Sequence, residues 1–291
     1  MSEPIVVTGA TGTIGERAVR LLLEKKADVT VVARDPKKAE ALRAAGARVV
    51  AGSFDDPASL QQAFAGARTL VSITPASARG YEQAVASFDA ARAAGVRKVV
   101  RVSALKADVD GPTDNTRQHG RTEAALRASG LAFVILRPHF FAQNLLGSLG
   151  SIAGEGKIYF GVGQGKLGVI DTRDVSDCVA EAASRADFDG ETIELTGPAS
   201  VDYHAVAAAV GRALGREVAY VPVPPEAVAD AVRKYGADEW TAGILRDYCA
   251  AYARGFGDFV TDGVQRVSGH APRSIDDFAR DVLAPLARAK G

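Results

Sequence analysis

A glycine-rich turn near the start, from Gly9 to Gly15, constrains this sequence more than any other feature. It follows the apolar residues 4–7 and precedes an amphipathic stretch over residues 16–26. Strand, tight turn and helix in this order are the context in which three spaced glycines bind a dinucleotide. The first glycine permits the turn, the second lets the backbone approach a pyrophosphate, and the third lets the helix pack on the strand. The flanking elements favour this interpretation over a purely structural turn, because the helix N-terminus then faces the anion.

The first half of the chain alternates short apolar runs with helical patterns. Continuous Val, Ile and Leu runs separated by helices predict an α/β protein with a doubly wound parallel sheet. Glycines after several helical runs are typical helix ends. Strands are predicted at 5–8, 28–33, 48–51, 69–73, 98–103 and 132–136, with helices such as 37–45, 58–65, 81–94 and 121–128 between them.

The regular alternation of apolar runs and helical patterns ends after about residue 138. A glycine-dense stretch with hairpin-like pieces, including residues 157–160, precedes strands at 192–195 and 217–221 and helices at 202–214, 226–234 and 238–253. We therefore predict a Rossmann domain over residues 1–150, to which parts of 168–195 return. Residues 151–291 are predicted to form a smaller mixed α/β substrate-binding lobe, which caps the carboxyl ends of the strands where ligands bind.

Composition excludes several classes of protein. The chain has 35 basic and 35 acidic residues, so its charge favours neither nucleic acid nor an anionic membrane. No secretory signal or apolar run of membrane-spanning length is visible, which predicts a soluble, cytoplasmic protein. Cys178 and Cys249 match no metal or redox spacing and are predicted to be buried, and the four histidines show no ligand spacing, so no metal is expected.

The second predicted strand ends in Arg34, about where NAD-binding proteins of this type carry an acid for the ribose 2′-hydroxyl. Arg34 and Lys37 favour a 2′-phosphate and hence NADP(H), although NAD(H) stays an alternative because Asp35 is adjacent. Asp35 before Pro36 is also a good helix cap, and we prefer that role. Asp56 before Pro57 supplies a second cap, which leaves Asp55, beside Phe54, as a candidate for the adenine edge.

Several motifs in order resemble the NmrA-like group of atypical short-chain dehydrogenases/reductases, which includes bacterial quinone and triphenylmethane reductases. They are residues 8–15, 52–56, 135–138, 170–175, 195–198 and 269–274. The resemblance implies two lobes with NADP(H) in the larger and the substrate between them. Together with the residues argued above, it gives a candidate substrate pocket with His139, Phe140, Phe141 and Asn144, although apolar residues such as Phe140 and Phe141 are also expected as core at the end of a strand. The candidate cofactor site is Thr8, Gly9, Thr11, Gly12, Thr13, Ile14, Gly15, Arg34, Lys37, Phe54, Asp55, Thr74, Pro75, Ser103, Ala104, His119 and Pro138.

The catalytic position departs from the wider superfamily. Its usual Tyr-x-x-x-Lys is replaced by His119 and Glu123, while Ser103 remains as the third member. The resemblance implies that this histidine is shared with the quinone and triphenylmethane reductases. His119 is a candidate to donate a proton or a hydrogen bond, or simply to touch ribose, and Glu123 is predicted to be structural, pairing with Arg121 or Arg127 or stabilising the helix start.

These features lead to three hypotheses. The first is an NADPH-dependent oxidoreductase that passes a hydride to a conjugated carbonyl or quinone-like small molecule, for which positioning supplies most of the catalysis. The second is an NADP(H)-sensing regulatory protein without turnover, and the third a tailoring reductase or isomerase of bacterial secondary metabolism. The expected partner is an aromatic or quinone-like substrate, and the protein is expected to be a monomer or homodimer.

Overall fold

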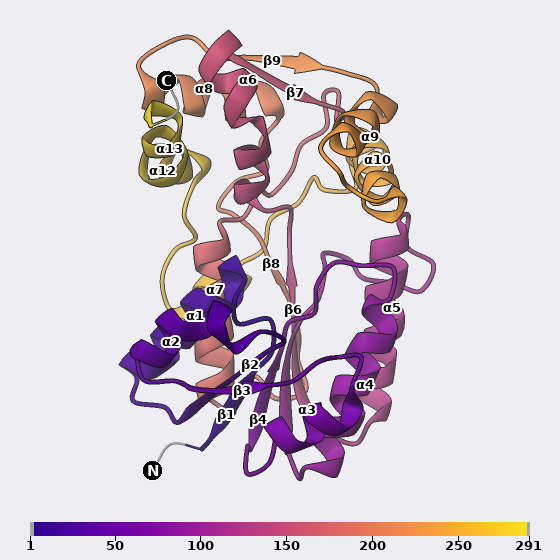
Figure 1. Ribbon diagram of the computed structural model, residues 1–291. Coiled ribbons are helices and arrows are strands. Elements are labelled where there is room, and N and C mark those ends of the chain that lie inside the picture. Colours follow the sequence, from indigo (N-terminus) through magenta and orange to yellow (C-terminus); the bar gives the residue numbers. More distant parts are fainter. Residues whose placement is uncertain (1–2, 290–291) are drawn as a thin grey trace. The chain divides into compact units, whose positions relative to one another are not determined.

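Two compact units make up the part of the computed structural model that is described, residues 3–289 (Figure 1). Unit 1 holds the residues up to Gly111 together with Asn115–Arg137 and Arg173–Glu194. Unit 2 holds Pro112–Asp114, Pro138–Thr172 and the residues from Leu195 onward. The chain thus returns to unit 1 twice, at Asn115 after a short excursion into unit 2 and at Arg173 after a longer one.

Unit 1 is built on a seven-stranded sheet in the order β3-β2-β1-β4-β5-β6-β8. Ile5 of β1 pairs in parallel with Val29 of β2 on one side and with Thr69 of β4 on the other, which confirms the doubly wound prediction. The strand order reverses direction beside β1, and ligands of such sheets bind at the carboxyl ends of the strands at this point. The strands are β1 (Ile5–Val7), β2 (Val29–Ala33), β3 (Arg48–Ala51), β4 (Thr69–Ser72), β5 (Lys98–Val102), β6 (Ala132–Pro138) and β8 (Thr192–Leu195).

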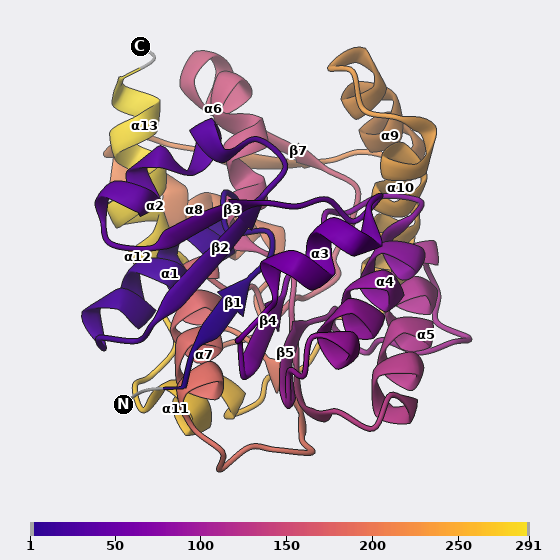
Figure 2. The same cartoon turned by 60° about the horizontal axis from the view of Figure 1, so that its bottom comes forward.

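Helices cover both faces of this sheet, and Figure 2 shows α3, α4 and α5 on one face and α1 and α7 on the other. The first face buries Phe64, Phe88 and Leu126 against strand residues such as Ile135. The glycines predicted to end helices, Gly46, Gly66, Gly95 and Gly130, all have positive φ, as a helix-ending glycine requires. The helices of unit 1 are α1 (Thr13–Glu24), η1 (Pro36–Ala39), α2 (Glu40–Ala44), α3 (Pro57–Ala63), α4 (Gly80–Ala93), α5 (Asp114–Ala128) and α7 (Thr172–Ser184).

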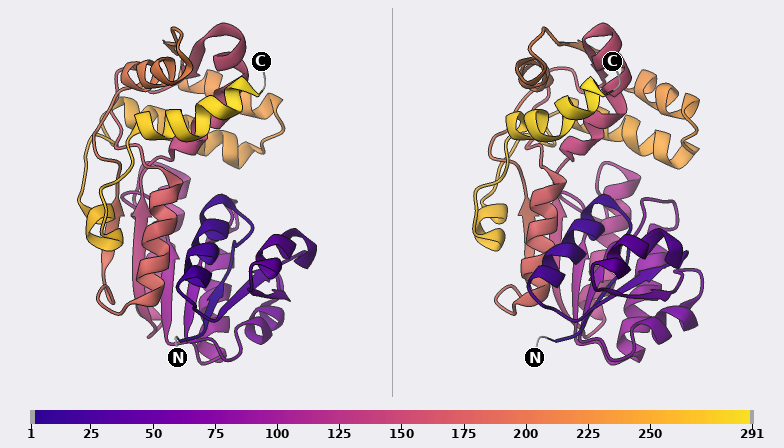
Figure 3. Two further views of the ribbon diagram at one scale, coloured as in Figure 1. Left: turned by 90° about the vertical axis from the view of Figure 1, so that its left-hand side faces the viewer. Right: turned by 60° about the vertical axis from the view of Figure 1, so that its left-hand side comes forward.

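Unit 2 contains a two-stranded sheet in which β7 (Lys157–Phe160) pairs in parallel with β9 (Ala219–Pro222). Residues 157–160 therefore do not form the predicted hairpin, because their partner strand lies some sixty residues along the chain. Helices α9 and α10 pack side by side and appear in orange in both views of Figure 3. The helices of unit 2 are η2 (Ala142–Ser148), α6 (Leu149–Glu155), α8 (Tyr203–Leu214), α9 (Pro225–Lys234), α10 (Glu239–Ala253), α11 (Gly263–Ser268), α12 (Ile275–Phe278), η3 (Ala279–Leu283) and α13 (Ala284–Arg288).

Aromatic rings form much of the interior of unit 2. Phe160 stacks on Tyr203 with 4.7 Å between ring centroids, and Tyr252 stacks on Tyr248 at 5.4 Å. Cys249 is fully buried in this unit and Cys178 in unit 1, so both cysteines are buried as predicted. Within residues 3–289, no helix combines the length and the apolar character that crossing a bilayer would require.

Candidate functional site

The glycine turn joins β1 to α1 at the point where the strand order reverses. Gly9 has φ +65°, and a Cβ there would lie 2.7 Å from the carbonyl oxygen of Ile73. A Cβ on Gly15 would lie 2.4 Å from the carbonyl oxygen of Gly9, so only glycine lets the helix start this close to the strand. Gly12 caps α1 without any side-chain hydrogen bond, and it is exposed together with Thr11 and Thr13. The first amides of α1 thus open onto an uncapped, accessible turn that suits an anion.

A cleft in unit 1 opens beside this turn and gathers residues from the ends of β1, β2, β3 and β4. It brings together many of the residues predicted to hold the cofactor, while Lys37 is exposed outside its lining. The sequence did not single out Gln83, which reaches the cleft from α4. The lining residues are Thr8, Gly9, Thr11, Val32, Ala33, Arg34, Gly52, Ser53, Phe54, Asp55, Leu60, Pro75 and Gln83.

Charged residues at the cleft have different roles. The Asp35 carboxylate accepts a hydrogen bond from the Lys37 amide at 3.1 Å and caps η1, which confirms the preferred role of this aspartate. The Asp56 carboxylate caps α3 in the same way, through the Ser59 amide at 3.2 Å. Arg34 is exposed and lines the cleft, so its guanidinium is available for a phosphate. Asp55 lies 2.8 Å from Arg79 in an exposed ion pair that the sequence did not predict.

Thr8 contributes to the framework of the cleft. Its hydroxyl donates to the carbonyl of Ile73 and also accepts from the Ile73 amide, at 3.2 Å in each case. This side chain is buried and ties the end of β1 to the segment after β4. The close glycines, the uncapped helix and Arg34 fit a phosphorylated dinucleotide, with its pyrophosphate at the turn and its adenosine end in the cleft.

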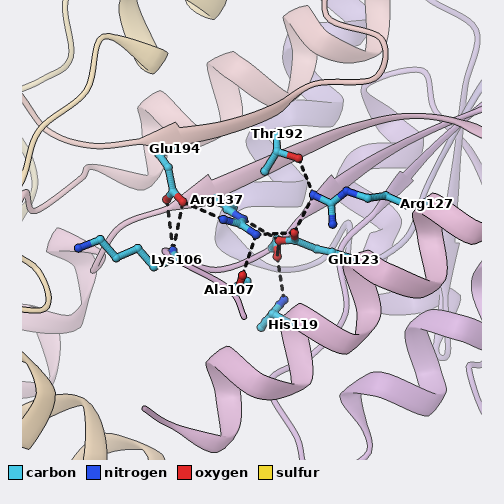
Figure 4. A network of polar contacts seen from close by, with 9 residues as sticks. Lys106, Ala107, His119, Glu123, Arg127, Arg137, Thr192 and Glu194 are labelled. Carbon is cyan, nitrogen blue, oxygen red and sulfur yellow. Dashed lines mark hydrogen bonds and ion pairs between the residues drawn. The ribbon is translucent and has the colours of Figure 1, made fainter. Parts of the chain in front are cut away.

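Glu123 on α5 is the centre of a second polar cluster of unit 1 (Figure 4). Its side chain is only 1% exposed. The guanidinium of Arg137 donates to both carboxylate oxygens, at 2.8 and 2.6 Å, and Arg127 donates to Oε2 at 3.1 Å. The predicted pairing with Arg127 is confirmed, whereas Arg121 instead lies over the ring of Tyr81 at 5.2 Å. A buried carboxylate of this kind is stable only because cations and hydrogen bonds surround it.

Arg137 and Glu194 extend this cluster from β6 to β8. Arg137 donates to Glu194 at 3.1 Å and to the carbonyl of Ala107 at 2.7 Å. Burial opposes the charge on Arg137, but its hydrogen bonds to Glu123 and Glu194 raise its pKa above the ordinary value. Sequence reasoning placed Arg137 only within a family motif and missed Glu194. Each is a charged residue in an otherwise apolar strand, and that was the available signal.

Ser103 connects Glu123 to His119. The Ser103 hydroxyl lies 2.6 Å from Oε1 of Glu123 and 3.4 Å from Nδ1 of His119. The imidazole is half-buried. Burial lowers the pKa of His119 to about 3, and the positive charges of Arg101 and Arg137 act in the same direction. The structure therefore brings together the two predicted catalytic residues, with a neutral imidazole at neutral pH.

Arg101 of β5 is a buried cation that the sequence analysis did not identify. Its guanidinium donates to Thr74 Oγ1 at 2.9 Å and to the carbonyl of Ser72 at 3.3 Å, so it links the ends of β4 and β5. In the described part of the chain, its Nε is the one fully buried side-chain nitrogen or oxygen without a hydrogen-bond partner. Burial lowers the pKa of Arg101 to about 10, against the attraction of Glu123.

The predicted substrate-pocket residues lie at the start of the second segment of unit 2. His139 is buried; its Nδ1 accepts from the Phe140 amide at 2.7 Å, and its Nε2 lies 3.0 Å from the carbonyl of Gly257. Both ring nitrogens of His139 are therefore hydrogen-bonded to backbone groups. Phe140 packs against Phe160 and Tyr252 at centroid distances of 5.5 and 5.8 Å, Phe141 is half-buried, and Asn144 is exposed. Ala104 and Pro138, predicted to lie along the cofactor, are both buried.

These features define a class: an α/β protein with a phosphate-binding glycine turn and with His and Glu in place of a Tyr/Lys pair. A family model described as NAD(P)H-binding matches residues 9–186. The chain belongs to this NAD(P)H-binding family, which confirms the predicted cofactor class.

Relatives cover nearly the whole chain. It is 32% identical over 285 residues to an NAD(P)H azoreductase of Xenophilus azovorans, covering 98% of this chain and 100% of that protein. It is 28% identical over 276 residues to quinone oxidoreductase 2 of Escherichia coli, covering 93% of this chain and 96% of the relative.

Solved structures share the fold. The NADPH-dependent quinone oxidoreductase of Escherichia coli, crystallised with NADPH, superposes with a TM-score of 0.87 at 26% identity and covers 94% of this chain and 98% of its own. The negative transcriptional regulator Nmra, in complex with NAD, has a TM-score of 0.80 at 19% identity over 100% of this chain and 98% of its own, which shows the fold alone. The predicted resemblance to the NmrA-like group with its quinone reductases is thereby confirmed.

Proposed function

We propose that this protein is an NADPH-dependent oxidoreductase that passes a hydride to a conjugated carbonyl or quinone-like small molecule. The observation that carries the proposal is the catalytic position itself. His119 is held neutral there, and the Glu123 carboxylate accepts hydrogen bonds from Arg137 and Arg127, so neither side chain is placed to hand an acidic proton to the acceptor. An acceptor reduced at such a site has to be electrophilic without protonation, as quinones are. The azoreductase and quinone oxidoreductase relatives support this class of substrate.

The protein's own residues supply binding and orientation. When bound, the reduced nicotinamide supplies the hydride. The turn from Gly9 to Gly15 holds the pyrophosphate, and Arg34 favours the phosphorylated form of the cofactor. Thr74, Ser103 and His119 are grouped through Arg101 and Glu123 at the ends of β4 and β5, where the resemblance implies the nicotinamide half. Phe140, which is half-buried and packs against the aromatic interior of unit 2, is a candidate to contact a flat substrate.

The test is an acceptor panel with purified protein. The rate of NADPH oxidation is measured with quinones, azo dyes, conjugated enones and simple aliphatic ketones as acceptors. Each measurement is repeated with NADH, and the two rates are compared. We expect turnover with the first three classes, negligible turnover with aliphatic ketones, and a preference for NADPH. Tight binding of NADPH without oxidation by any acceptor would contradict an enzymatic role and favour the regulatory alternative. Turnover confined to complex aromatic ethers or polyketides would favour the tailoring alternative.

Location and assembly belong to the same proposal. We expect the protein to work in the cytoplasm as a monomer or homodimer, which fractionation and light scattering would check.

A further inference from the structure

The Glu123 carboxylate acts only as a hydrogen-bond acceptor. Both of its oxygens accept from Arg137, and Oε2 also accepts from Arg127. The remaining neighbour is Ser103, whose hydroxyl lies 2.6 Å from Oε1. An ionised carboxylate is an acceptor only, so the single Ser103 hydroxyl hydrogen points to Glu123.

This direction decides the tautomer of His119. With its hydrogen committed to Glu123, the Ser103 oxygen can only accept from the imidazole, at the 3.4 Å contact with Nδ1. A hydrogen bond across this contact therefore requires the hydrogen on Nδ1. The groups that face the imidazole are Arg101 from β5, Arg137 from β6 and Glu123 from its own helix, with Glu194 of β8 behind Arg137. Burial and the two arginines hold the ring neutral, and a neutral ring with hydrogen on Nδ1 has a bare Nε2.

Nε2 of His119 is also accessible. It makes no hydrogen bond within residues 3–289, yet the one fully buried unpartnered side-chain nitrogen or oxygen in that range is Nε of Arg101. The imidazole itself is half-buried. Nε2 is therefore neither hydrogen-bonded to any described residue nor fully buried, and it is the free end of the series of hydrogen bonds that runs from His119 through Ser103 to Glu123.

We propose that Glu123, acting through Ser103, is a positioning residue that fixes His119 as a hydrogen-bond acceptor at Nε2. The group it recognises is a hydroxyl donor, for which we assign the nicotinamide ribose of the bound dinucleotide. This inference rests on the proposed function and sharpens it: His119 binds the cofactor and does not protonate the acceptor. Addition of the hydride to a quinone carbonyl system leaves an oxyanion, and that oxyanion takes its proton from water.

The tautomer is measurable without turnover. In protein labelled with ¹⁵N at histidine, the His119 signals are identified by their loss in His119→Asn, and their shifts and couplings show which nitrogen carries hydrogen. At about pH 7 we expect hydrogen on Nδ1 and a bare Nε2. Addition of NADP⁺ should shift the Nε2 signal as it accepts a hydrogen bond. An imidazolium, or hydrogen on Nε2 in the wild-type protein, would overturn the proposal.

Two variants separate positioning from a general structural effect. Ser103→Ala removes the acceptor for Nδ1 and should move the hydrogen to Nε2. Glu194→Gln is the matched control, because it also contacts Arg137 but does not touch Ser103, and it should leave the tautomer unchanged. An unchanged tautomer in a folded Ser103→Ala protein contradicts the proposal; if that variant does not fold, the wild-type spectrum still decides.

Affinity gives an independent measurement. His119→Phe removes the acceptor and should weaken binding of NADP⁺ roughly 3- to 10-fold, the range expected for one neutral hydrogen bond. His119→Gln supplies a carbonyl oxygen and should recover most of that loss. Equal affinities in wild type and His119→Phe would overturn the assigned ligand. Failure of the proposed function would give a different result: NADP⁺ would bind normally and His119 would have the expected tautomer, but no acceptor would be reduced.

Discussion

At the scale of single residues, we propose that the charge on Arg34 favours NADP(H) over NAD(H) in the cleft that this residue lines. Its neighbour Asp35 is occupied as a helix cap, so the cleft presents a guanidinium and not a carboxylate at this position. A charged hydrogen bond to a phosphate is stronger than a neutral one and is lost completely when the side chain is removed.

Arg34→Ala should raise the dissociation constant of NADPH by roughly 10-fold or more and leave that of NADH within about 2-fold. Calorimetric or fluorescence titration would measure both. Lys37→Ala is the control, because Lys37 is exposed outside the lining of the cleft, and its effect should be smaller. An equal loss for NADPH and NADH would mean that Arg34 does not contact the 2′-phosphate.

His119 gives the protein a pH dependence with a defined sign. Its folded pKa, about 3, is below the unfolded value of about 6.5. Between these values the unfolded chain binds the proton and the folded chain does not, so stability falls as pH decreases below about 6.5. At higher pH the imidazole is neutral in both states and contributes no such slope.

His119→Asn should therefore lose less stability than the wild type when the pH is lowered from about 7 to about 4.5. Urea unfolding at a series of pH values measures the two slopes. His270 belongs to unit 2, where its Nδ1 lies 2.9 Å from the carbonyl of Ala271, and it offers a comparison: His270→Asn should retain the His119 slope. Parallel curves for wild type and His119→Asn would show that His119 titrates normally in the fold.

At the scale of elements, two glycines at the junction of β1 and α1 have different roles: Gly15 is required for folding, and Gly12 is expected to be required for binding. Gly15 has no space for a Cβ, because that atom would lie 2.4 Å from the Gly9 carbonyl oxygen and 2.8 Å from Cα of Ala10. Gly12 does have space, since its nearest neighbour would be 3.4 Å away. The two glycines thus serve different purposes, although they stand in one motif.

Gly15→Ala should destabilise the protein by about 1–3 kcal/mol, the usual cost of overpacking. Gly12→Ala should cost less, about 0.5–1 kcal/mol, which is the usual disadvantage of alanine at a helix N-cap, but it should weaken NADPH binding because its methyl group lies at the uncapped start of α1. Urea unfolding and cofactor titration of both variants test this separation. Equal destabilisation by the two substitutions would contradict it.

The elements also explain why the cluster around Glu123 was only partly predictable. The positions of Ser103 and Glu123 followed from the motif on α5 and the end of β5. Arg101, Arg137 and Glu194 lie on three different strands, and the order β5-β6-β8 places these strands side by side. Arg137 then contacts both Glu123 and Glu194, while Glu123 acts on Arg101 through its charge. A charged residue within an apolar strand indicates a buried partner, but its identity depends on the strand order.

At the scale of the whole molecule, the cleft proposed to hold the cofactor lies in unit 1, so cofactor binding should stabilise that unit first. The cleft residues and the cluster around Glu123 all belong to unit 1. A ligand that binds only the folded state stabilises it by mass action.

NADPH at about 100 times its dissociation constant should therefore add about 2.7 kcal/mol to the free energy of unfolding of unit 1. Hydrogen exchange read segment by segment should show stronger protection in β1, β4 and β5 than in α9 and α10 of unit 2. NAD⁺ at the same concentration is the control and should give less protection. Equal protection of both units would mean that the two unfold as one cooperative body.

The sequence by itself determined the parallel sheet, the glycine turn, the helix caps at Asp35 and Asp56 and the exchange of Tyr and Lys for His119 and Glu123. These are local properties: the periodicity of apolar residues, the steric freedom of glycine and short-range capping leave their pattern in adjacent positions. The tertiary structure decided that residues 157–160 pair with β9, that Arg137 neutralises Glu123, and that Ser103 directs its hydrogen away from His119. The direction of a hydrogen bond depends on which groups compete for one proton, and that competition exists only after distant strands have come together.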